Sequence, residues 1–305
     1  MHKRIVRLVK SKVENGTVLS EELQTVIAQV LSEKTGRLVV GIRLSDCLCG
    51  CQAKVFVIDT LPHYQRYALK LYSMQAPHNP RTSAENEFRA LQTFYGACRG
   101  RPDIAVPEPL ALLERDPGYL MRHLEGRCLV PYLRHARLDS LSTSLLAKRI
   151  VDGLAIFYGS VGGVYGDFQP RNLLVGSDLR VGFLDPTIPD PGHLAIVANR
   201  RFAPWSADMG YWLFSVLVKS ISRPLPQLNG GRPLWHLTQH LFIRECNLVG
   251  GTRAEAFALE VTRIADRFFR CLDRNPRERL LRVLGRTVLK VAARSIFQYR
   301  SPYPS

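Results

Sequence analysis

The segment from residue 164 to residue 187, VYGDFQPRNLLVGSDLRVGFLDPT, arranges three polar side chains around a short predicted hairpin. Asp167 and Asn172 lie in a loop with a glycine and a proline, and Asp185 ends the strand-like run RVGFLD. The hairpin would fold the chain back and bring Asn172 and Asp185 together. Two oxygen ligands at the mouth of a hairpin suit a hard cation such as Mg²⁺, with Asp167 beside them to orient a hydroxyl nucleophile.

The part of the chain before this segment predicts one helix followed by a sheet. Ser20 is a predicted N-cap, and Gly36 ends that helix. Three runs rich in Val, Ile, Tyr and Phe then predict antiparallel strands: RLVVGIRL, AKVFVID and RYALKLY. A helix from about Ser83 to Tyr95 follows, and then two more strands, LALLERD and GYLMRHL, with a turn at Pro117-Gly118.

The pattern after about Gly126 is mostly helical. The predicted helices cover Ser142–Ser160, Ser206–Ser220, Leu234–Cys246, Ala254–Leu272 and Pro276–Phe297. A hairpin of the runs NLLVG and RVGFLD, with its turn at Ser177-Asp178, interrupts them. The sequence therefore predicts an α+β protein, with a small domain of antiparallel strands over residues 1–124 and a larger, mostly helical domain over residues 125–305.

The charge of the chain favours an anionic partner. Its 305 residues contain 42 Lys and Arg against 26 Asp and Glu, a formal net charge of +16. The seven cysteines contain no Cys-x-x-Cys pair, which argues against a disulfide framework or a standard zinc site and favours a reducing cytoplasm. The basic N-terminus lacks the apolar core of a secretory signal, and no apolar run is long enough to span a bilayer. We therefore expect a cytoplasmic protein.

The loop and hairpin resemble the catalytic segment of the protein-kinase-like fold, and within it that of the aminoglycoside phosphotransferase and choline kinase group. In that group the loop often reads His-Gly-Asp-x-x-x-x-Asn, and the next strand ends in Ile-Asp. Here the matching residues are Tyr165-Gly166-Asp167, Asn172 and Leu184-Asp185. The resemblance implies two lobes: a small antiparallel-sheet N-lobe with one main helix, and a larger, mostly helical C-lobe that carries the catalytic loop and the acceptor site.

The resemblance also implies a nucleotide site in the N-terminal lobe. Lys70, in RYALKLY, falls where the family keeps its phosphate-binding lysine, and Glu87 is its expected ion-pair partner. Glu85 is two residues away and cannot share the helix face of Glu87. The nucleotide-covering loop would be SDCLCGCQAK, in which Gly50 is the one glycine. The edge that binds adenine would be GYLMRHLEG, with Met121, Arg122 and Leu124.

On this interpretation the cofactors are ATP and Mg²⁺. Asn172 and Asp185 would hold Mg²⁺. Lys70 would bind the phosphates, and Asp167 would accept the proton of the acceptor hydroxyl. Arg171 lies between the two loop residues and could touch the γ-phosphate or an anionic acceptor.

Departures from the family pattern leave other functions open. Tyr165 replaces the usual histidine, although a tyrosine can still pack there and donate a hydrogen bond. Pro186 follows Asp185, and the nucleotide-covering loop is poor in glycine. A pseudokinase that binds nucleotide or a partner without turnover is therefore one alternative.

A protein kinase is a second alternative. Only residues 186–207 separate Asp185 from Asp208, which lies in the segment SADMGYWLF and resembles the buried helix after the activation segment. That short stretch favours a small hydroxyl acceptor over a polypeptide: a sugar, an amino alcohol or an aminoglycoside-like molecule. The charge of the chain favours an acceptor that is anionic or lipid-linked.

The C-terminal helices are strongly basic. Residues 253–294 hold 11 Arg and Lys and five Asp and Glu. One predicted stripe consists of Arg282, Arg286, Lys290 and Arg294, opposed by Leu281, Leu284, Val288, Val291 and Ala292. A solvated helix face explains this stripe. The alternatives are contact with an acidic acceptor, with the acidic inner face of a membrane at its periphery, or with nucleic acid, which ranks last because no RNA- or DNA-binding motif is present.

Overall fold

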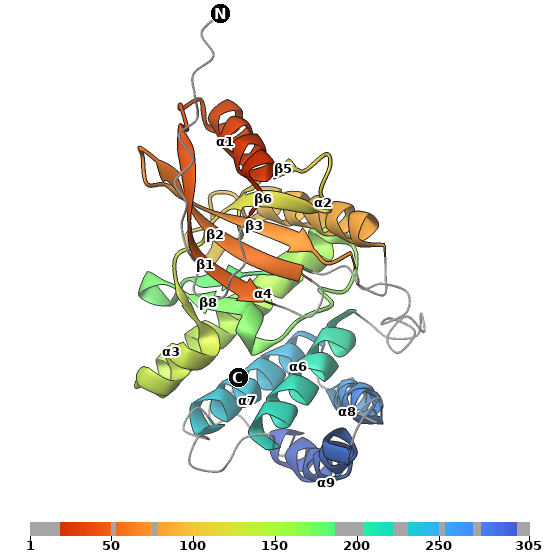
Figure 1. Ribbon diagram of the computed structural model, residues 1–305. Helices are drawn as coiled ribbons and strands as arrows, with labels where there is room; N and C mark the ends of the chain where they lie inside the picture. Colours follow the sequence, from red (N-terminus) through yellow and green to blue (C-terminus); the bar gives the residue numbers. More distant parts are fainter. Residues whose placement is uncertain are drawn as a thin grey trace, which may run out of the picture. The chain divides into compact units, whose positions relative to one another are not determined.

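The computed structural model describes residues 19–49, 53–74, 79–186, 204–221, 231–249, 254–270 and 276–297. The chain divides into two compact units, residues 1–95 with 107–124 and residues 96–106 with 125–305 (Figure 1). The first unit contains an antiparallel sheet and the second is mostly helical, so the predicted α+β class is confirmed. The predicted domain boundary after residue 124 stays a prediction, because compactness alone does not demonstrate independent folding.

The sheet of the first unit has its antiparallel strands in the order β1-β2-β3-β6-β5. Their bounds are β1 Gly41–Cys49, β2 Ala53–Leu61, β3 Arg66–Tyr72, β5 Pro109–Leu112 and β6 Gly118–Arg122. In this register Lys70 of β3 pairs with Val55 of β2 and with Tyr119 of β6. Lys70 therefore lies on the central strand of the sheet.

The first strand differs from the prediction. β1 begins later than RLVVGIRL suggests and continues to Cys49, through residues that the sequence assigns to the nucleotide-covering loop. The ladder with β2 explains this extension, because it continues past a bulge to the pair of Cys49 and Lys54. Gly50, the glycine of the predicted loop, lies outside the described residues.

Helix α1 (Glu21–Thr35) has the two ends that its sequence predicts. The Leu23 N–H donates a hydrogen bond to the Ser20 hydroxyl at 3.2 Å, which caps the first turn. Gly36 ends the helix in the left-handed conformation, with a φ of 66° that a residue without a side chain adopts readily.

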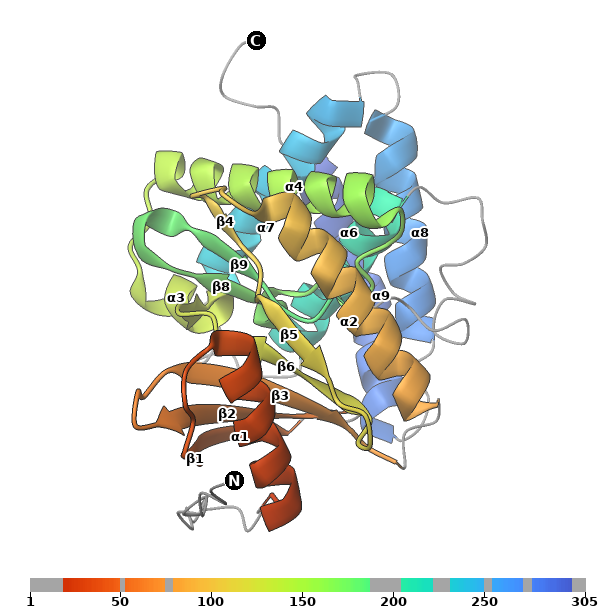
Figure 2. The same cartoon turned by 90° about the horizontal axis from the view of Figure 1, so that it is seen from above.

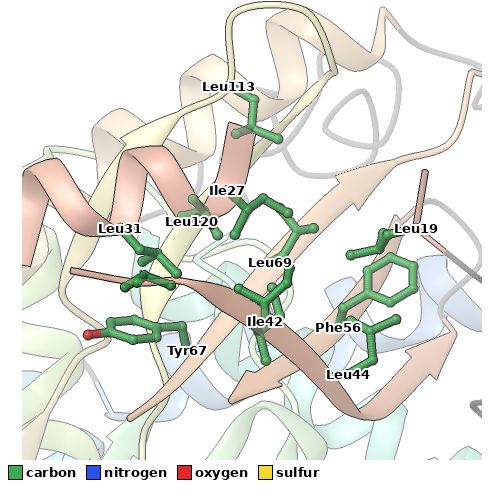
Figure 3. Packing of buried hydrophobic residues seen from close by; sticks show 13 residues of the cluster. Leu19, Ile27, Leu31, Ile42, Leu44, Phe56, Tyr67, Leu69, Leu113 and Leu120 are labelled. Carbon is green, nitrogen blue, oxygen red and sulfur yellow. The ribbon is translucent and has the colours of Figure 1, made fainter. Parts of the chain in front are cut away.

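Helices α1 and α2 (Pro80–Cys98) contact opposite faces of the sheet. Ile27 and Leu31 of α1 pack with Leu69 of β3 in the buried cluster shown in Figure 3. Side chains alternate between the two faces along a strand, so the next residue, Lys70, points the other way and meets Glu87 of α2. One face of the sheet is therefore an apolar core and the other holds a charged pair.

The second unit combines a small sheet with a group of helices (Figure 2). Its strands, in the order β4-β9-β8-β7, are β4 Ile104–Ala105, β7 Arg127–Cys128, β8 Leu173–Val175 and β9 Val181–Phe183. Its helices are α3 Leu129–His135, α4 Ser140–Val161, α6 Pro204–Ile221, α7 Gly231–Val249, α8 Ala254–Arg270 and α9 Pro276–Phe297. The predicted hairpin is confirmed as the antiparallel pair β8–β9, with Leu173 opposite Phe183.

The long helices lie where the apolar periodicity places them. α9 has the predicted bounds, and α4, α6 and α7 extend beyond theirs by a turn or less. The predicted end of α8, at Leu272, lies outside the described residues. The sequence did not predict α3, β4 or β7, because elements of seven or two residues show too little periodicity to stand out.

We predict that Gly153→Ala destabilises the second unit. A Cβ atom on Gly153 of α4 would collide with the ring of Phe183, which is fully buried on β9. Overpacking of this kind lowers the free energy of unfolding by about 1–3 kcal/mol. The measurement is urea unfolding of the full chain.

Gly159→Ala, on the same helix, is the matched control. Gly159 is exposed, and nothing lies within 4 Å of a Cβ atom built on it. Alanine should therefore raise the free energy of unfolding by about 0.5–1 kcal/mol, because it restricts the unfolded chain. Equal stability of the two variants would contradict the packing of Phe183 against α4.

Candidate functional site

A buried ion pair joins Lys70 of β3 to Glu87 of α2. Lys70 Nζ lies 2.7 Å from Glu87 Oε1 and 2.9 Å from Oε2. The two side chains are 6% and 2% exposed. Glu85, the other candidate partner, pairs instead with Arg81 at 2.8 Å and is partly exposed. Glu87 is therefore the acid that contacts the strand lysine.

Two tyrosines complete the surroundings of Glu87. The Tyr119 hydroxyl donates to Glu87 Oε1 at 2.6 Å, and the Tyr72 hydroxyl donates to Oε2. Lys70 Nζ also lies 5.2 Å from the centre of the Tyr72 ring, within the range of a cation–π interaction. These contacts offset the desolvation of the buried carboxylate and hold the ammonium group in one place.

The sheet register explains why these residues meet. Lys70 and Tyr72 share a face of β3, and Tyr119 stands opposite Lys70 on β6. The sequence analysis missed both tyrosines. The spacing of Lys70 and Tyr72 in RYALKLY is a signal that could have revealed one of them, because alternate residues of a strand share a face. Tyr119 is 32 residues from Glu87, and only the register brings it there.

The predicted adenine-binding edge at the end of β6 is engaged in part within its own unit. The Arg122 N–H donates to the Glu108 carbonyl at 2.8 Å, and the Arg122 guanidinium lies 2.9 Å from the Glu108 carboxylate. The His123 N–H donates to the Arg66 carbonyl at 3.3 Å. Met121 is paired within the sheet as well. The binding of adenine by Met121, Arg122 and Leu124 stays a prediction.

In the second unit, the predicted catalytic loop holds Asp167 and Asn172 against each other. Asn172 Nδ2 donates to the Asp167 carbonyl and to Asp167 Oδ2, both at 2.8 Å. Asn172 is buried and ends the 3₁₀ turn Pro170–Asn172. The spacing Asp-x-x-x-x-Asn thus folds into one compact turn, with the amide nitrogen of Asn172 directed at Asp167 and the amide oxygen directed away from it.

Further donors contact the Asp167 carboxylate. Gln169 Nε2 donates to Oδ1, Arg171 Nη2 lies 3.5 Å from Oδ2, and Tyr211 of α6 shares a hydrogen bond with this carboxylate. Burial, together with the charge of Asp167, raises the pKa of Tyr211 above its usual value, so its hydroxyl remains a proton donor. The sequence analysis assigned no role to Gln169 or Tyr211. Tyr211 lies three residues after Asp208, a spacing that places both on one helix face.

The β8–β9 hairpin brings Asn172 and Asp185 to the same end, as predicted. The Leu184 N–H donates to the Asn172 carbonyl at 2.8 Å, one step beyond the pair of Leu173 and Phe183. Asp185 then adopts a φ of 61°, in the left-handed region that few residues with side chains enter. Such backbone conformations are concentrated at functional sites, where the surrounding structure maintains them.

Asn172 and Asp185 supply the donor chemistry that Mg²⁺ prefers. The Asp185 carboxylate and the Asn172 amide oxygen are hard ligands, and Mg²⁺ in nucleotide sites completes its shell with waters and phosphate oxygens. Within the part of the chain that the structure describes, no group of three or more His, Cys, Asp or Glu could hold a metal. The binding of Mg²⁺ by Asn172 and Asp185 stays a prediction.

Tyr165, which the resemblance aligns with a histidine, supports the loop from the core. Its hydroxyl donates to the Leu184 carbonyl at the end of β9. Its ring is fully buried, and its centre lies 5.0 Å from that of Phe157, 6.0 Å from that of Phe168 and 6.1 Å from that of Phe183. The packing and the hydrogen bond expected of this tyrosine are confirmed.

Asp208 of α6 anchors the same loop through its backbone. Its Oδ2 accepts hydrogen bonds from the Tyr165 N–H at 2.7 Å and the Tyr158 hydroxyl at 2.9 Å, and its Oδ1 accepts one from the Gly166 N–H at 2.9 Å. Burial raises the pKa of Asp208 to about 7, because desolvation outweighs the three hydrogen bonds and the charge of Asp167 adds to the rise. Asp208 thus connects α6 to the residues that precede Asp167.

The Lys70 group belongs to the first unit and the Asp167 group to the second. Each group is a complete local arrangement within its own unit. Their convergence on one nucleotide stays a prediction.

No protein-family model matches the chain, and no curated protein matches it. Among solved structures, the chain is similar to the kinase PK-1 of Cydia pomonella granulovirus, with 16% identity and a TM-score of 0.40, over 55% of this chain and 59% of that one. It thus spans less than two thirds of the viral kinase. It is also similar to the kinase domain of Mycobacterium tuberculosis PknI, with 18% identity and a TM-score of 0.40, over 67% of this chain and 88% of that one.

The order of the elements along the chain agrees with the resemblance to the protein-kinase-like fold. An antiparallel sheet bears a lysine on its third strand, and the next helix bears the glutamate that pairs with it. A loop with Asp167 and Asn172, a hairpin that ends at Asp185 and a set of helices follow in the second unit. These elements appear in the order that the resemblance implies.

We predict that Asp208→Asn changes how stability depends on pH. The pKa of Asp208 is raised in the folded chain, so the carboxyl group favours folding at low pH, and this contribution is lost as pH rises from about 4 to about 7. The stability of the wild type relative to the variant should therefore fall by on the order of 2 kcal/mol between about pH 5 and pH 8. The measurement is urea unfolding of both proteins across that range.

Asp178→Asn is the control for this series. Asp178 is exposed in the hairpin turn and has a φ of 52°, which asparagine tolerates well. This variant makes the same substitution at an exposed position, so it separates the effect of the amide from the effect of burial. Parallel profiles for Asp208→Asn and the wild type would contradict the raised pKa.

Proposed function

We propose that the chain is an ATP-dependent phosphotransferase, similar to the aminoglycoside phosphotransferase and choline kinase group, that transfers the γ-phosphate to a hydroxyl of a small molecule. The observation that carries the proposal is the buried pair of Lys70 and Glu87. A buried ion pair contributes little net stability, because desolvation of both charges cancels much of their attraction. A charged pair retained in such a place indicates a functional position.

Lys70 would bind the phosphates of ATP. Glu87 keeps the ammonium group in place, and the hydroxyls of Tyr72 and Tyr119 in turn hold the Glu87 carboxylate. Positioning of this kind supports the proposal because phosphoryl transfer depends on placing charge near the phosphate oxygens rather than on covalent chemistry by the protein.

Asn172 and Asp185 would hold Mg²⁺. The hydrogen bonds from Asn172 Nδ2 to Asp167 leave the amide oxygen as the atom that Asn172 presents to a cation. Bound Mg²⁺ would neutralise part of the charge on the phosphate oxygens.

Asp167 would act on the acceptor. Its carboxylate would accept a hydrogen bond from the acceptor hydroxyl and take the proton as the new O–P bond forms and the bond between the β–γ bridging oxygen and the γ-phosphorus breaks, which releases ADP. Gln169, Asn172 and Tyr211 hold the carboxylate in one orientation. Arg171 is exposed and 3.5 Å from Asp167, a place from which it could contact the γ-phosphate or an anionic acceptor.

Two features of the sequence support the proposed class of acceptor. Residues 186–207 form a short connection between Asp185 and Asp208, which favours a small molecule over a polypeptide. The net charge of +16 favours an anionic acceptor, such as a phosphorylated sugar or a lipid-linked glycan, over a polycationic aminoglycoside.

A nucleotide-binding module without turnover is the second candidate. Donors from four side chains already surround the Asp167 carboxylate: Gln169, Arg171, Asn172 and Tyr211. These donors occupy positions around the carboxylate that an acceptor hydroxyl would need, unless one of them moves aside. The buried Pro186 directly after Asp185 supports the same candidate.

We predict that Asp167→Asn strongly slows phosphoryl transfer but leaves nucleotide binding intact. Loss of the proton acceptor should lower turnover by about 10²- to 10⁴-fold, while Mg·ATP still raises the unfolding temperature. The measurement is ADP release by the full chain with a panel of hydroxyl acceptors, including sugar phosphates, amino alcohols and aminoglycosides. Asp178→Asn is the control and should keep wild-type turnover.

Each outcome of this experiment discriminates between the candidates. Equal turnover in Asp167→Asn and the wild type would contradict the role of Asp167. Binding of Mg·ATP without turnover of any acceptor would favour the nucleotide-binding module. Incorporation of labelled phosphate into the chain itself would favour a protein kinase. Failure to bind ATP or GTP in the presence of Mg²⁺ would contradict the proposal that the chain is a phosphotransferase.

We predict that Lys70→Met lowers turnover by about 10²- to 10³-fold, because the phosphates lose a positioned cation. The variant leaves Glu87 without its cation and should also lose about 3–5 kcal/mol of stability, so turnover is measured at a temperature at which urea unfolding shows the variant to be folded. Lys54→Met is the matched control, because Lys54 is exposed on the neighbouring strand β2. Equal loss of activity in both variants would contradict a specific role for Lys70.

A further inference from the structure

Helix α9 packs against α6, α7 and α8 through one of its faces. Gly285, Leu289 and Ala292 are buried on that face. A Cβ atom on Gly285 would collide with the ring of Phe269 of α8, so the two helices approach closely there. This face accounts for the attachment of α9 to the rest of its unit.

A neighbouring side of α9 is also apolar, and it is exposed. Five large aliphatic side chains lie there: Leu280 (58% exposed), Val283 (60%), Leu284 (42%), Val288 (40%) and Val291 (67%). The last four lie three, four, eight and eleven residues after Leu280, so all five are on one side of the helix. They extend along about 16 Å of the helix axis. We call these five residues the α9 stripe. Among the described helices, α9 exposes the most large hydrophobic side chains.

The α9 stripe revises the expectation from the sequence. The pattern places Leu284, Val288 and Val291 together with Leu281 and Ala292, opposite the cations. In the structure Ala292 is buried and Leu281 is half-buried, whereas the other three are exposed. The apolar side that the sequence opposes to the cations is therefore exposed in part, and an exposed apolar stripe of this kind usually marks an interaction surface.

The charge of α9 indicates which kind of partner the α9 stripe would bind. Pro276–Phe297 contains six Arg and Lys and one acid, Glu278. Arg279, Arg286 and Lys290 are spaced by seven and four residues, so they follow one edge of the stripe beside Val283. Arg286 is also ion-paired to Asp266 of α8, whereas Lys290 is exposed.

We propose that the α9 stripe docks the chain on an anionic lipid bilayer, with the helix parallel to the membrane plane. An interfacial helix of this kind buries an apolar face among acyl chains while Lys and Arg contact acidic headgroups. No helix in the described ranges is both long and apolar enough to cross a bilayer, so the contact is peripheral. This inference does not depend on the proposed function.

Two other occupants fit the observations less well. A second copy of the chain would bring two strongly cationic α9 helices together, and the like charges would repel each other. The described stripe contains aliphatic side chains and no Trp or Tyr, whereas the energetic centres of protein interfaces are enriched in Trp, Tyr and Arg. A bilayer needs no such anchor, because it takes up aliphatic side chains without shape complementarity.

The test is flotation of the full chain with vesicles of equal parts phosphatidylglycerol and phosphatidylcholine, compared with vesicles of phosphatidylcholine alone. We expect binding to the anionic vesicles. The double variant Val283→Glu and Val291→Glu should lose affinity by about tenfold for each valine, because each loses the burial of its side chain in the membrane. Both valines are exposed, so urea unfolding should match that of the wild type.

The double variant Leu141→Glu and Leu145→Glu is the matched control. It adds the same charge at two exposed apolar positions of α4, which are 71% and 40% exposed. It should keep most of the vesicle affinity. Equal losses in both double variants would mean that charge alone controls binding and would overturn the proposal.

Three other results would also overturn it. The first is no binding of the wild type to anionic vesicles at low salt. The second is unchanged binding of the α9 variant, which would place the membrane contact elsewhere in the chain. The third is a dimer in sedimentation analysis that dissociates in the α9 variant but not in the α4 control, which would make a second copy the occupant of the stripe.

Discussion

A buried carboxylate surrounded by donors organises the candidate site in each unit. In the first unit Glu87 receives the Lys70 ammonium group and two tyrosine hydroxyls. In the second unit Asp208 receives two backbone N–H groups and the Tyr158 hydroxyl. An unpaired charge in such a place would cost several kcal/mol, so the donors have to be in position whenever the unit is folded. The same requirement fixes the residues next to them, Lys70 in one unit and Asp167 in the other.

The chain departs from the usual inside–outside pattern at the places where we propose function. Charged and polar side chains are buried at Lys70, Glu87 and Asp208, and large aliphatic side chains are exposed along α9. Departures of this kind lower stability, and in folded proteins they are found mainly at functional sites. The nucleotide site and the membrane surface that we propose would account for these departures, and they involve different residues.

Sequence reasoning found the residues of the site that are close together along the chain or that belong to a regular element. Asp167, Asn172 and Asp185 lie within one loop and hairpin, so their spacing was enough to predict that the hairpin would bring the last two together. Tyr211, which helps to hold Asp167 in place, was missed because it belongs to α6, a helix that comes after residues 187–203 in the chain. Tyr119 was missed for the same reason, since a contact 32 residues away in the chain leaves no local pattern.

The amino-acid sequence by itself determined where α1 begins and ends, through Ser20 and Gly36, and where α9 begins, through Pro276, because caps and proline act on the backbone within one turn. It also determined that α9 has an apolar side opposite a basic stripe. Only the tertiary structure decided which side is buried. Gly285 lets Phe269 approach the helix axis, so the face around it packs against α8, and the five residues of the α9 stripe remain in contact with solvent.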